Sequence, residues 1–127
     1  MPFARDLLSY SRAAVGVGTW AAPSASWRLF GLGDLAPSGP VATAAGSAEV
    51  MTRLFAARDL VLGAGLRHPS PDVRRAVLQA GIAMDLVDAT ASVIGVRRGA
   101  PARSLVGVTA GALLLAALGA AALRDES

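Results

Sequence analysis

The hydrophobic and polar positions divide the chain into four long, largely apolar segments with helical periodicity. Proline ends the first segment and separates the second from the third, because it cannot continue a helix. After these breaks we expect Asp72, or Ser70 as the nearby alternative, to cap the third helix. The pattern predicts helices at about residues 4–22, 48–66, 73–96 and 104–123.

The fourth segment is the clearest candidate for a membrane-spanning helix. Leu105 to Leu123 is free of charged residues and lies between Arg103 and Arg124. About 20 apolar residues suffice to cross the hydrocarbon core of a bilayer. Two of its glycines have the GxxxG spacing that permits close helix approach, Gly107 and Gly111.

The other segments combine apolar faces with polar, small-residue faces. One side of the first helix is predicted to carry Arg5, Ser9, Arg12, Gly16 and Thr19. One side of the third is predicted to carry Gly81, Asp85, Asp88, Ser92 and Gly95, and the opposite side Ile82, Leu86, Val93 and Val96. These patterns predict polar faces turned inward and an apolar side of the third helix that meets lipid.

The second segment places an Arg-Asp pair, Arg58 and Asp59, in the middle of an apolar run. An ionised side chain in hydrocarbon costs about 3 kcal/mol even on lenient insertion scales. We therefore expect both side chains to face a protein interior and to find partners. Earlier in the same segment, Glu49 and Arg53 have the spacing of an intrahelical ion pair.

Composition supports the same class of protein. The chain has 127 residues, 54% of them hydrophobic, with a mean hydropathy of +0.51, which suits a single domain in a bilayer. All 12 basic residues are arginines, spread along the chain with few aromatic residues, so we expect no nucleic-acid partner. The absence of cysteine excludes disulfides, thiolate nucleophiles and Cys-ligated metals.

Together these features predict an all-α fold: a four-helix transmembrane bundle with antiparallel up-down topology, in which short turns make the second and third helices neighbours. The long connection after Pro23, with an amphipathic stretch from Trp27 to Leu32, is expected at the membrane surface. Gly31 and Gly33 lack the preceding strand and third glycine of a dinucleotide-binding loop. Arginine counts of five against four at the two ends favour cytoplasmic termini by a narrow margin.

The charges in the membrane region define the candidate site. Equal distances from the turn near Pro69 place Arg53 level with Asp85, so Arg53 or Arg58 is expected to pair with Asp85. Arg12 is then free to meet Asp59 or Asp88. The candidate proton-transfer or ligand carboxylates are Asp59, Asp85 and Asp88, and the candidate charge partners or anion contacts are Arg12, Arg53 and Arg58.

Several functions fit such a network. The first hypothesis is a structural, accessory or homo-oligomeric membrane component whose ion pairs fix helix register. The second is a membrane-embedded acid/base enzyme, an isomerase or cyclase, acting on a lipophilic small molecule through an incompletely compensated carboxylate. A third is a proton-linked small transporter. His68 is expected at the lipid headgroups, and no cofactor and no metal site are predicted.

The chain resembles a group of small actinobacterial membrane proteins classed as a domain of unknown function. The likeness lies in an arginine-containing first helix that ends in proline and Phe30-Gly31, the ARDLxLGxGL motif at residues 57–66, and an Asp-x-x-Asp third helix. The resemblance implies a four-helix membrane protein in the cell membrane with no assigned activity.

Overall fold

The structure of the protein is a computed structural model that describes residues 3–22, 42–100 and 102–127. Its helices are α1 (Phe3–Ala21), α3 (Ala42–Gly65), α4 (Pro71–Arg97) and α5 (Ala102–Asp125). The described residues contain helices and turns and no strand, which confirms the all-α prediction. The amphipathic stretch at Trp27, the Gly31 and Gly33 pair and Arg28 lie outside the described residues.

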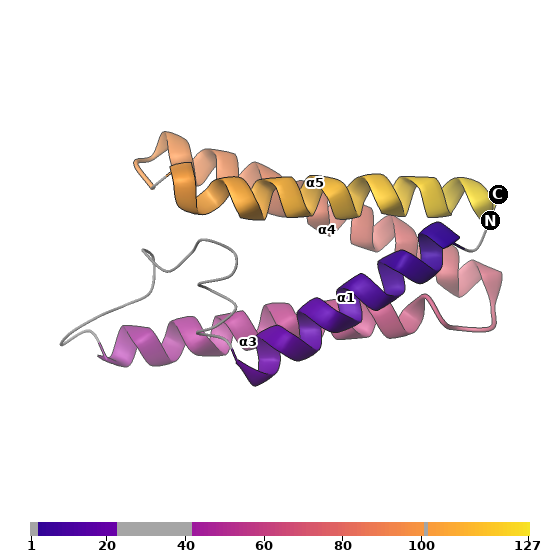
Figure 1. Cartoon of the computed structure of the whole chain (residues 1–127), viewed down its shortest axis with the longest axis horizontal. Helices are drawn as coiled ribbons and strands as arrows, with labels where there is room; N and C mark the ends of the chain where they lie inside the picture. Colours follow the sequence, from indigo (N-terminus) through magenta and orange to yellow (C-terminus); the bar gives the residue numbers. More distant parts are fainter. Residues whose placement is uncertain (1–2, 23–41, 101) are drawn as a thin grey trace.

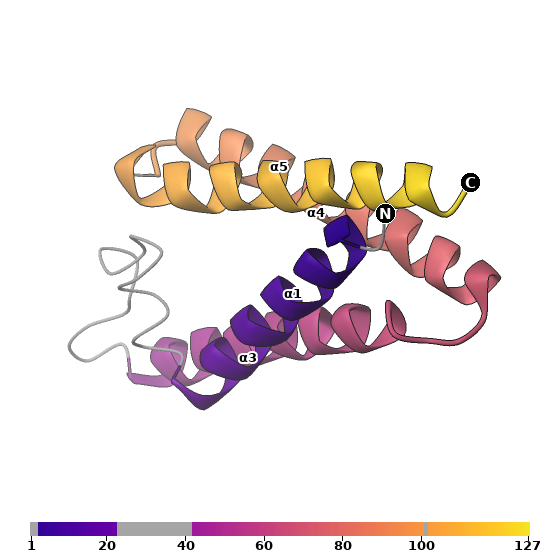
Figure 2. The same cartoon turned by 45° about the vertical axis from the view of Figure 1, so that its right-hand side comes forward.

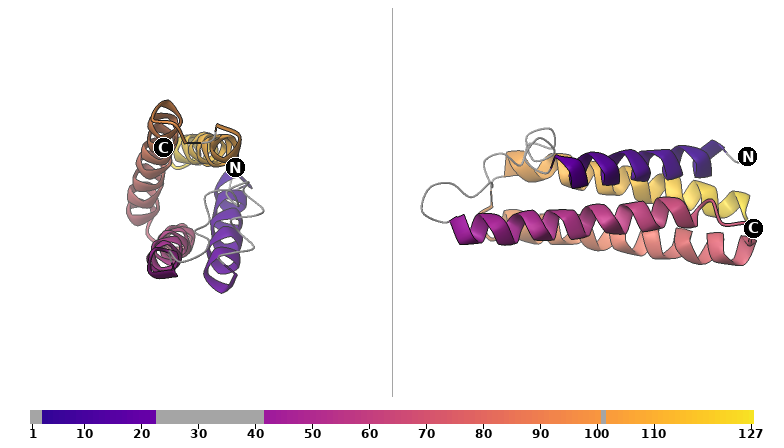
Figure 3. Two further views of the ribbon diagram at one scale, coloured as in Figure 1. Left: turned by 90° about the vertical axis from the view of Figure 1, so that its left-hand side faces the viewer. Right: turned by 90° about the horizontal axis from the view of Figure 1, so that it is seen from below.

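Successive helices run in alternating directions, as the predicted antiparallel up-down topology requires. The two termini and the α3–α4 turn lie at one end of the bundle (Figure 1). Viewed end-on, the helices occupy the corners of a four-sided bundle, with α1 diagonal to α4 (Figure 3). The most extensive contacts join α1 to α3 and α4 to α5. These two pairs meet at the end that holds the termini and diverge toward the other (Figure 2).

The helix boundaries follow local chemistry, with two differences from the prediction. Ser70, in an extended conformation with φ −73° and ψ 125°, occupies the N-cap position of α4, and its side chain makes no capping hydrogen bond. Asp72 is therefore not the cap but lies in the first turn, where a carboxylate favours the helix dipole. Helix α3 begins at Ala42, earlier than predicted, because alanine-rich sequence has high helix propensity.

The α4–α5 connection requires a glycine. Gly99 has a φ of +98°, a conformation that side-chain-bearing residues rarely adopt. The amide of Ala100 then donates a hydrogen bond of 2.9 Å back to the Gly95 carbonyl, which closes the end of α4. The chain reverses here without an unpaired carbonyl at Gly95.

The bundle buries charged side chains beside an apolar core of Leu8, Leu66 and Leu78, and it exposes large apolar side chains. Its fully buried side chains include Arg12 and Asp85, each 1% exposed. Large apolar side chains are exposed on every helix: Val17 on α1 (59%), Val61 on α3 (71%), Val87 on α4 (65%) and Leu114 on α5 (62%). A soluble protein normally shows the opposite arrangement, with charged groups outside and large apolar groups inside.

The predicted faces of α1 and α4 are largely confirmed. Buried residues on α1 include Ser9, Arg12, Gly16 and Thr19, and those on α4 include Gly81, Asp85 and Ser92. Asp88 is only half-buried, while Leu86, Val93 and Val96 are exposed as expected.

Gly111, one glycine of the GxxxG pair of α5, makes no close helix contact within this chain. A Cβ added at Gly111 would meet open space. The glycine of α5 that does allow close approach is Gly119, where a Cβ would lie 2.8 Å from a side-chain carbon of Ile82 on α4. Glycine spacing therefore did not locate the tight contact, which depends on the rotation of α5 about its axis.

Candidate functional site

One arginine joins three helices at the centre of the bundle. From α1, Arg12 reaches between α3 and α4, where Nη1 donates to Oδ1 of Asp59 at 2.9 Å and Nη2 donates to Oδ2 of Asp85 at 2.5 Å. Asp59 is 7% exposed, and the other two residues are more deeply buried. We call Arg12, Asp59 and Asp85 the arginine clamp. Because α1 and α4 lie diagonally, this guanidinium spans the bundle interior.

Small residues make room for the clamp. A Cβ on Gly81 would lie 3.0 Å from Nη2 of Arg12, in the space that the guanidinium occupies. A Cβ on Gly63 would lie 3.1 Å from the Ser9 carbonyl oxygen, so α1 and α3 approach closely there. The Ser9 hydroxyl adds a buried hydrogen bond of 2.9 Å to the Gly63 carbonyl. The helix faces that carry glycine and serine therefore provide the packing surface around a buried arginine.

A second ion pair lies beside the clamp, toward the outside of α3 and α4. Arg58 donates to both carboxylate oxygens of Asp88, at 2.8 and 3.4 Å, which is a forked geometry. The two side chains are 22% and 24% exposed. Arg58 also stacks over the Phe55 ring at 4.9 Å and lies 3.8 Å from the nearer Asp59 oxygen. This pair borders the clamp but is not sealed inside the bundle.

The structure corrects the predicted pairing of Asp85. Neither Arg53 nor Arg58 is its partner; Arg12 holds both Asp85 and Asp59. Arg53 instead pairs with Glu49 at 2.8 Å, as the i,i+4 spacing predicted, and donates to the Trp20 carbonyl. Equal distances from the turn misled the prediction because α3 and α4 diverge, and because α1 lies diagonally opposite α4.

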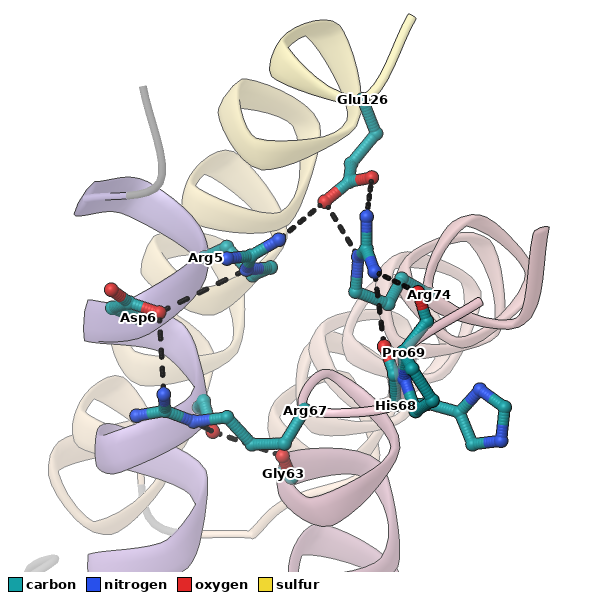
Figure 4. Close-up of polar contacts among 9 residues, drawn as sticks. Arg5, Asp6, Gly63, Arg67, His68, Pro69, Arg74 and Glu126 are labelled. Carbon is teal, nitrogen blue, oxygen red and sulfur yellow. Dashed lines mark hydrogen bonds and ion pairs between the residues drawn. The ribbon is translucent and has the colours of Figure 1, made fainter. Parts of the chain in front are cut away.

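A further cluster at the end with both termini was missed by sequence reasoning. The Glu126 carboxylate accepts hydrogen bonds from Arg5 at 2.9 Å and from two nitrogens of Arg74, each at 2.9 Å (Figure 4). Arg74 also donates to the His68 and Pro69 carbonyls of the α3–α4 turn. We call Glu126, Arg5 and Arg74 the terminal clasp. No sequence signal marked it, because it joins the two ends of the chain to Arg74 near the start of α4.

The clasp makes one pH-dependent contribution to stability. The hydrogen bonds from Arg74, and then from Arg5, hold the pKa of Glu126 below its usual range. The folded state therefore favours the ionised carboxylate, so its stabilisation is complete above the unfolded pKa, about 4.3, and declines as the pH falls through the folded pKa.

We expect Glu126→Gln to lower the melting temperature in detergent at pH 7 and to lose this difference from wild type under acid conditions. Thermal unfolding followed by circular dichroism at about pH 3 and at about pH 7 checks the expectation, because these pH values lie on either side of the ordinary pKa of glutamate. Glu49→Gln, which removes an exposed carboxylate that also pairs with arginine, is the matched control. An equal deficit for Glu126→Gln at both ends of the range would contradict the assignment.

His68 lies in the turn between α3 and α4. Its ring is exposed, and Nδ1 accepts a hydrogen bond of 3.1 Å from the Ser70 amide. Among the described residues, no group of three or more His, Asp or Glu side chains is arranged to hold a metal ion.

A hollow of about 500 Å³ lies between α4 and α5, away from the carboxylates. Its lining is apolar apart from Arg97 and Thr109, and Asp59, Asp85 and Asp88 do not contribute to it. The clamp itself offers hydrogen-bonded, enclosed ion pairs. Its geometry suits the fixing of helix positions better than contact with a diffusing substrate.

Comparison of the chain with protein-family models, curated proteins and solved structures gives no match. The resemblance to the actinobacterial group therefore stays a prediction. Function has to be argued from the geometry above.

Proposed function

We propose that the protein is a small four-helix integral membrane protein that serves as a structural or accessory component of a membrane assembly, in the simplest case with copies of itself. The observation that carries the proposal is the combination of buried ion pairs with exposed large apolar side chains. Charged side chains are paired inside, and large apolar side chains are exposed on all four helices. Lipid is the solvent in which this arrangement is stable.

Length and composition add support for two of the helices. Helices α4 and α5 are each long and apolar enough to cross a membrane. Helices α1 and α3 are less apolar because they carry Arg12, Arg58 and Asp59; Arg12 and Asp59 pair in the interior, and Arg58 pairs with Asp88 at its edge. In the proposed arrangement all four helices cross the bilayer of the cell membrane, with both termini and the α3–α4 turn on the cytoplasmic side.

In this role the arginine clamp is structural. Both clamp carboxylates accept hydrogen bonds from a guanidinium that is itself 1% exposed. An acid/base enzyme or a proton-linked transporter requires a carboxylate that a substrate or water can approach. Of the three candidate carboxylates Asp88 is the most accessible, so these two alternative functions rest on Asp88 alone.

The exposure of Arg58 and Asp88 indicates where a partner would dock. A partly exposed ion pair facing lipid is costly, whereas protein contact can cover it and complete its hydrogen bonding. Large apolar side chains flank the pair: Met51 (54% exposed) and Phe55 (48%) on α3, and Met84 (38%) on α4. We call this surface the α3–α4 face. A second copy of the chain is the simplest occupant, because its own Arg58 and Asp88 can interact with the same pair.

Cross-linking in membranes tests association through this face. The chain contains no cysteine, so Phe55→Cys introduces the single thiol of the protein. We expect oxidation to convert most of this variant to a disulfide-linked dimer. Leu114→Cys is the matched control, because it places a thiol at a position at least as exposed (62% against 48%) on α5, the helix diagonal to α3.

Cross-linking of Leu114→Cys without cross-linking of Phe55→Cys would contradict the assignment of the α3–α4 face as the contact surface. Lack of cross-linking by both variants would contradict self-association and turn the search toward another membrane protein as the partner. Activity that is lost in Asp88→Asn, with folding retained, would favour the enzyme or transporter alternative over the structural one.

A further inference from the structure

The hollow between α4 and α5 has the form of a lipid-binding groove. It opens near the α4–α5 connection and is lined by apolar side chains of both helices, among them Val93, Val96, Leu105 and Leu113. Its volume of about 500 Å³ lies within the range that small ligands occupy. Among the side chains that the structure describes, Arg97 is the one charged group in the lining.

The groove exists because small residues face the space between the two helices. Ala102 and Ala110 contribute little volume on α5. Thr109 presents no free hydroxyl, since its Oγ1 donates a hydrogen bond of 3.0 Å to the Leu105 carbonyl of its own helix. Val106, 63% exposed, forms part of the wall that opens outward. The surface therefore suits a hydrocarbon chain better than a polar ligand.

The dimensions of the groove match one leaflet of a bilayer. Its lining extends along α5 from Ala102 to Leu113, which at 1.5 Å per residue corresponds to about 16 Å. That length is about half of the 30 Å hydrocarbon core, the depth of one leaflet. Arg97 is the last residue of α4, at the same end as Ala102, where a membrane-spanning hairpin would meet the headgroups.

Charge identifies the class of lipid. Within the part of the chain that the structure describes, no acidic side chain forms an ion pair with Arg97. Arginine binds phosphate oxygens through its planar fork, and a headgroup that carries no cation of its own leaves the full negative charge of the phosphate for this contact. We propose that this groove binds one acyl chain of an anionic phospholipid, whose phosphate pairs with Arg97. The inference rests on the proposed placement of the protein in a membrane.

Native mass spectrometry of the purified chain in detergent tests the proposal, with phosphatidylglycerol and phosphatidylcholine of the same acyl chains as probes. We expect tighter binding of phosphatidylglycerol. Arg97→Gln should weaken it about five-fold, the effect of one cationic contact at a membrane surface. Ala110→Trp, which fills the groove from an exposed position, should abolish the preference.

Two control variants separate the groove from general effects. Arg98→Gln removes the neighbouring exposed charge, which does not line the groove, and Ala121→Trp adds the same bulk at an exposed position of α5 outside it. Both should bind phosphatidylglycerol as wild type does. An equal loss in Arg98→Gln, or unchanged binding in Ala110→Trp, would overturn the proposal. Displacement of the lipid by millimolar-range inorganic phosphate would also overturn it, because the site would then recognise the anion alone.

Carbonate extraction of cell membranes that contain the protein, done before detergent is added, keeps this inference distinct from the proposed function. Wild-type protein that alkaline carbonate releases from membranes would contradict the placement in a bilayer. Protein that resists carbonate but binds both lipids equally would contradict the anionic lipid site and leave the membrane placement standing.

Discussion

Arg12→Leu is expected to destabilise the bundle by about 3 to 5 kcal/mol, the usual cost of removing one partner from a buried ion pair. The substitution leaves Asp59 and Asp85 buried without their shared guanidinium, which holds α1, α3 and α4 together. Unfolding in detergent, followed by circular dichroism during titration with a denaturing detergent, measures the loss. Arg53→Leu removes a guanidinium from an exposed ion pair and should cost at most about 1 kcal/mol.

A combined variant tests whether the penalty comes from the unpaired carboxylates. Adding Asp59→Asn and Asp85→Asn to Arg12→Leu removes the buried negative charges, so part of the lost stability should return. If Arg12→Leu were as stable as Arg53→Leu, the clamp would not hold the helices. If the combined variant were less stable than Arg12→Leu alone, uncompensated charge would not be the cause of the loss.

Two glycines of α1 should respond to alanine with opposite signs. A Cβ on Gly16 would lie 2.9 Å from the Ala56 carbonyl oxygen and 2.6 Å from a Leu60 side-chain carbon on α3. Leu60 can move, but the backbone carbonyl can do so only if the helices separate. We therefore expect Gly16→Ala to destabilise the protein by about 1 to 3 kcal/mol, the usual cost of overpacking.

Gly18→Ala is the matched control because a Cβ there would meet nothing within 4 Å. It should be neutral or stabilise the protein by up to about 1 kcal/mol, since alanine favours a helix over glycine. The same unfolding titration measures both variants. Equal effects of the two substitutions would contradict the close approach of α1 and α3.

The helices and their buried faces were predictable from local patterns. Prolines set the breaks, and the polar stripe of α1 identified Arg12 as an inward-facing residue because helical periodicity is a local property. The third-helix stripe likewise placed Asp85 inside. Because Arg58 and Asp59 stand in an apolar stretch of sequence, we also predicted that each would have a charged partner.

The pairing of these charges was not predictable to the same degree. Which arginine meets Asp85 depends on the angle between the two helix pairs. Counting residues from the turn along α3 and α4 gives only their heights in the bundle and not that angle. Arg12 was assigned to Asp59 or Asp88, and the structure gives it Asp59 together with Asp85. The terminal clasp at Glu126 joins residues more than a hundred positions apart, so no local pattern marks it.

If all four helices cross a bilayer, as we propose, the two ends of α1 and α5 that Ala22 and Ser127 mark lie on opposite sides of the membrane. Ala22 follows the end of α1 opposite the termini, and Ser127 ends the chain; both are exposed. In a chain without cysteine, Ala22→Cys and Ser127→Cys each provide one thiol for a membrane-impermeant maleimide. We predict that Ala22→Cys reacts in intact cells and that Ser127→Cys reacts only after permeabilisation. Reaction of both from the same side would contradict the claim, because only the α4–α5 hairpin would then be inserted.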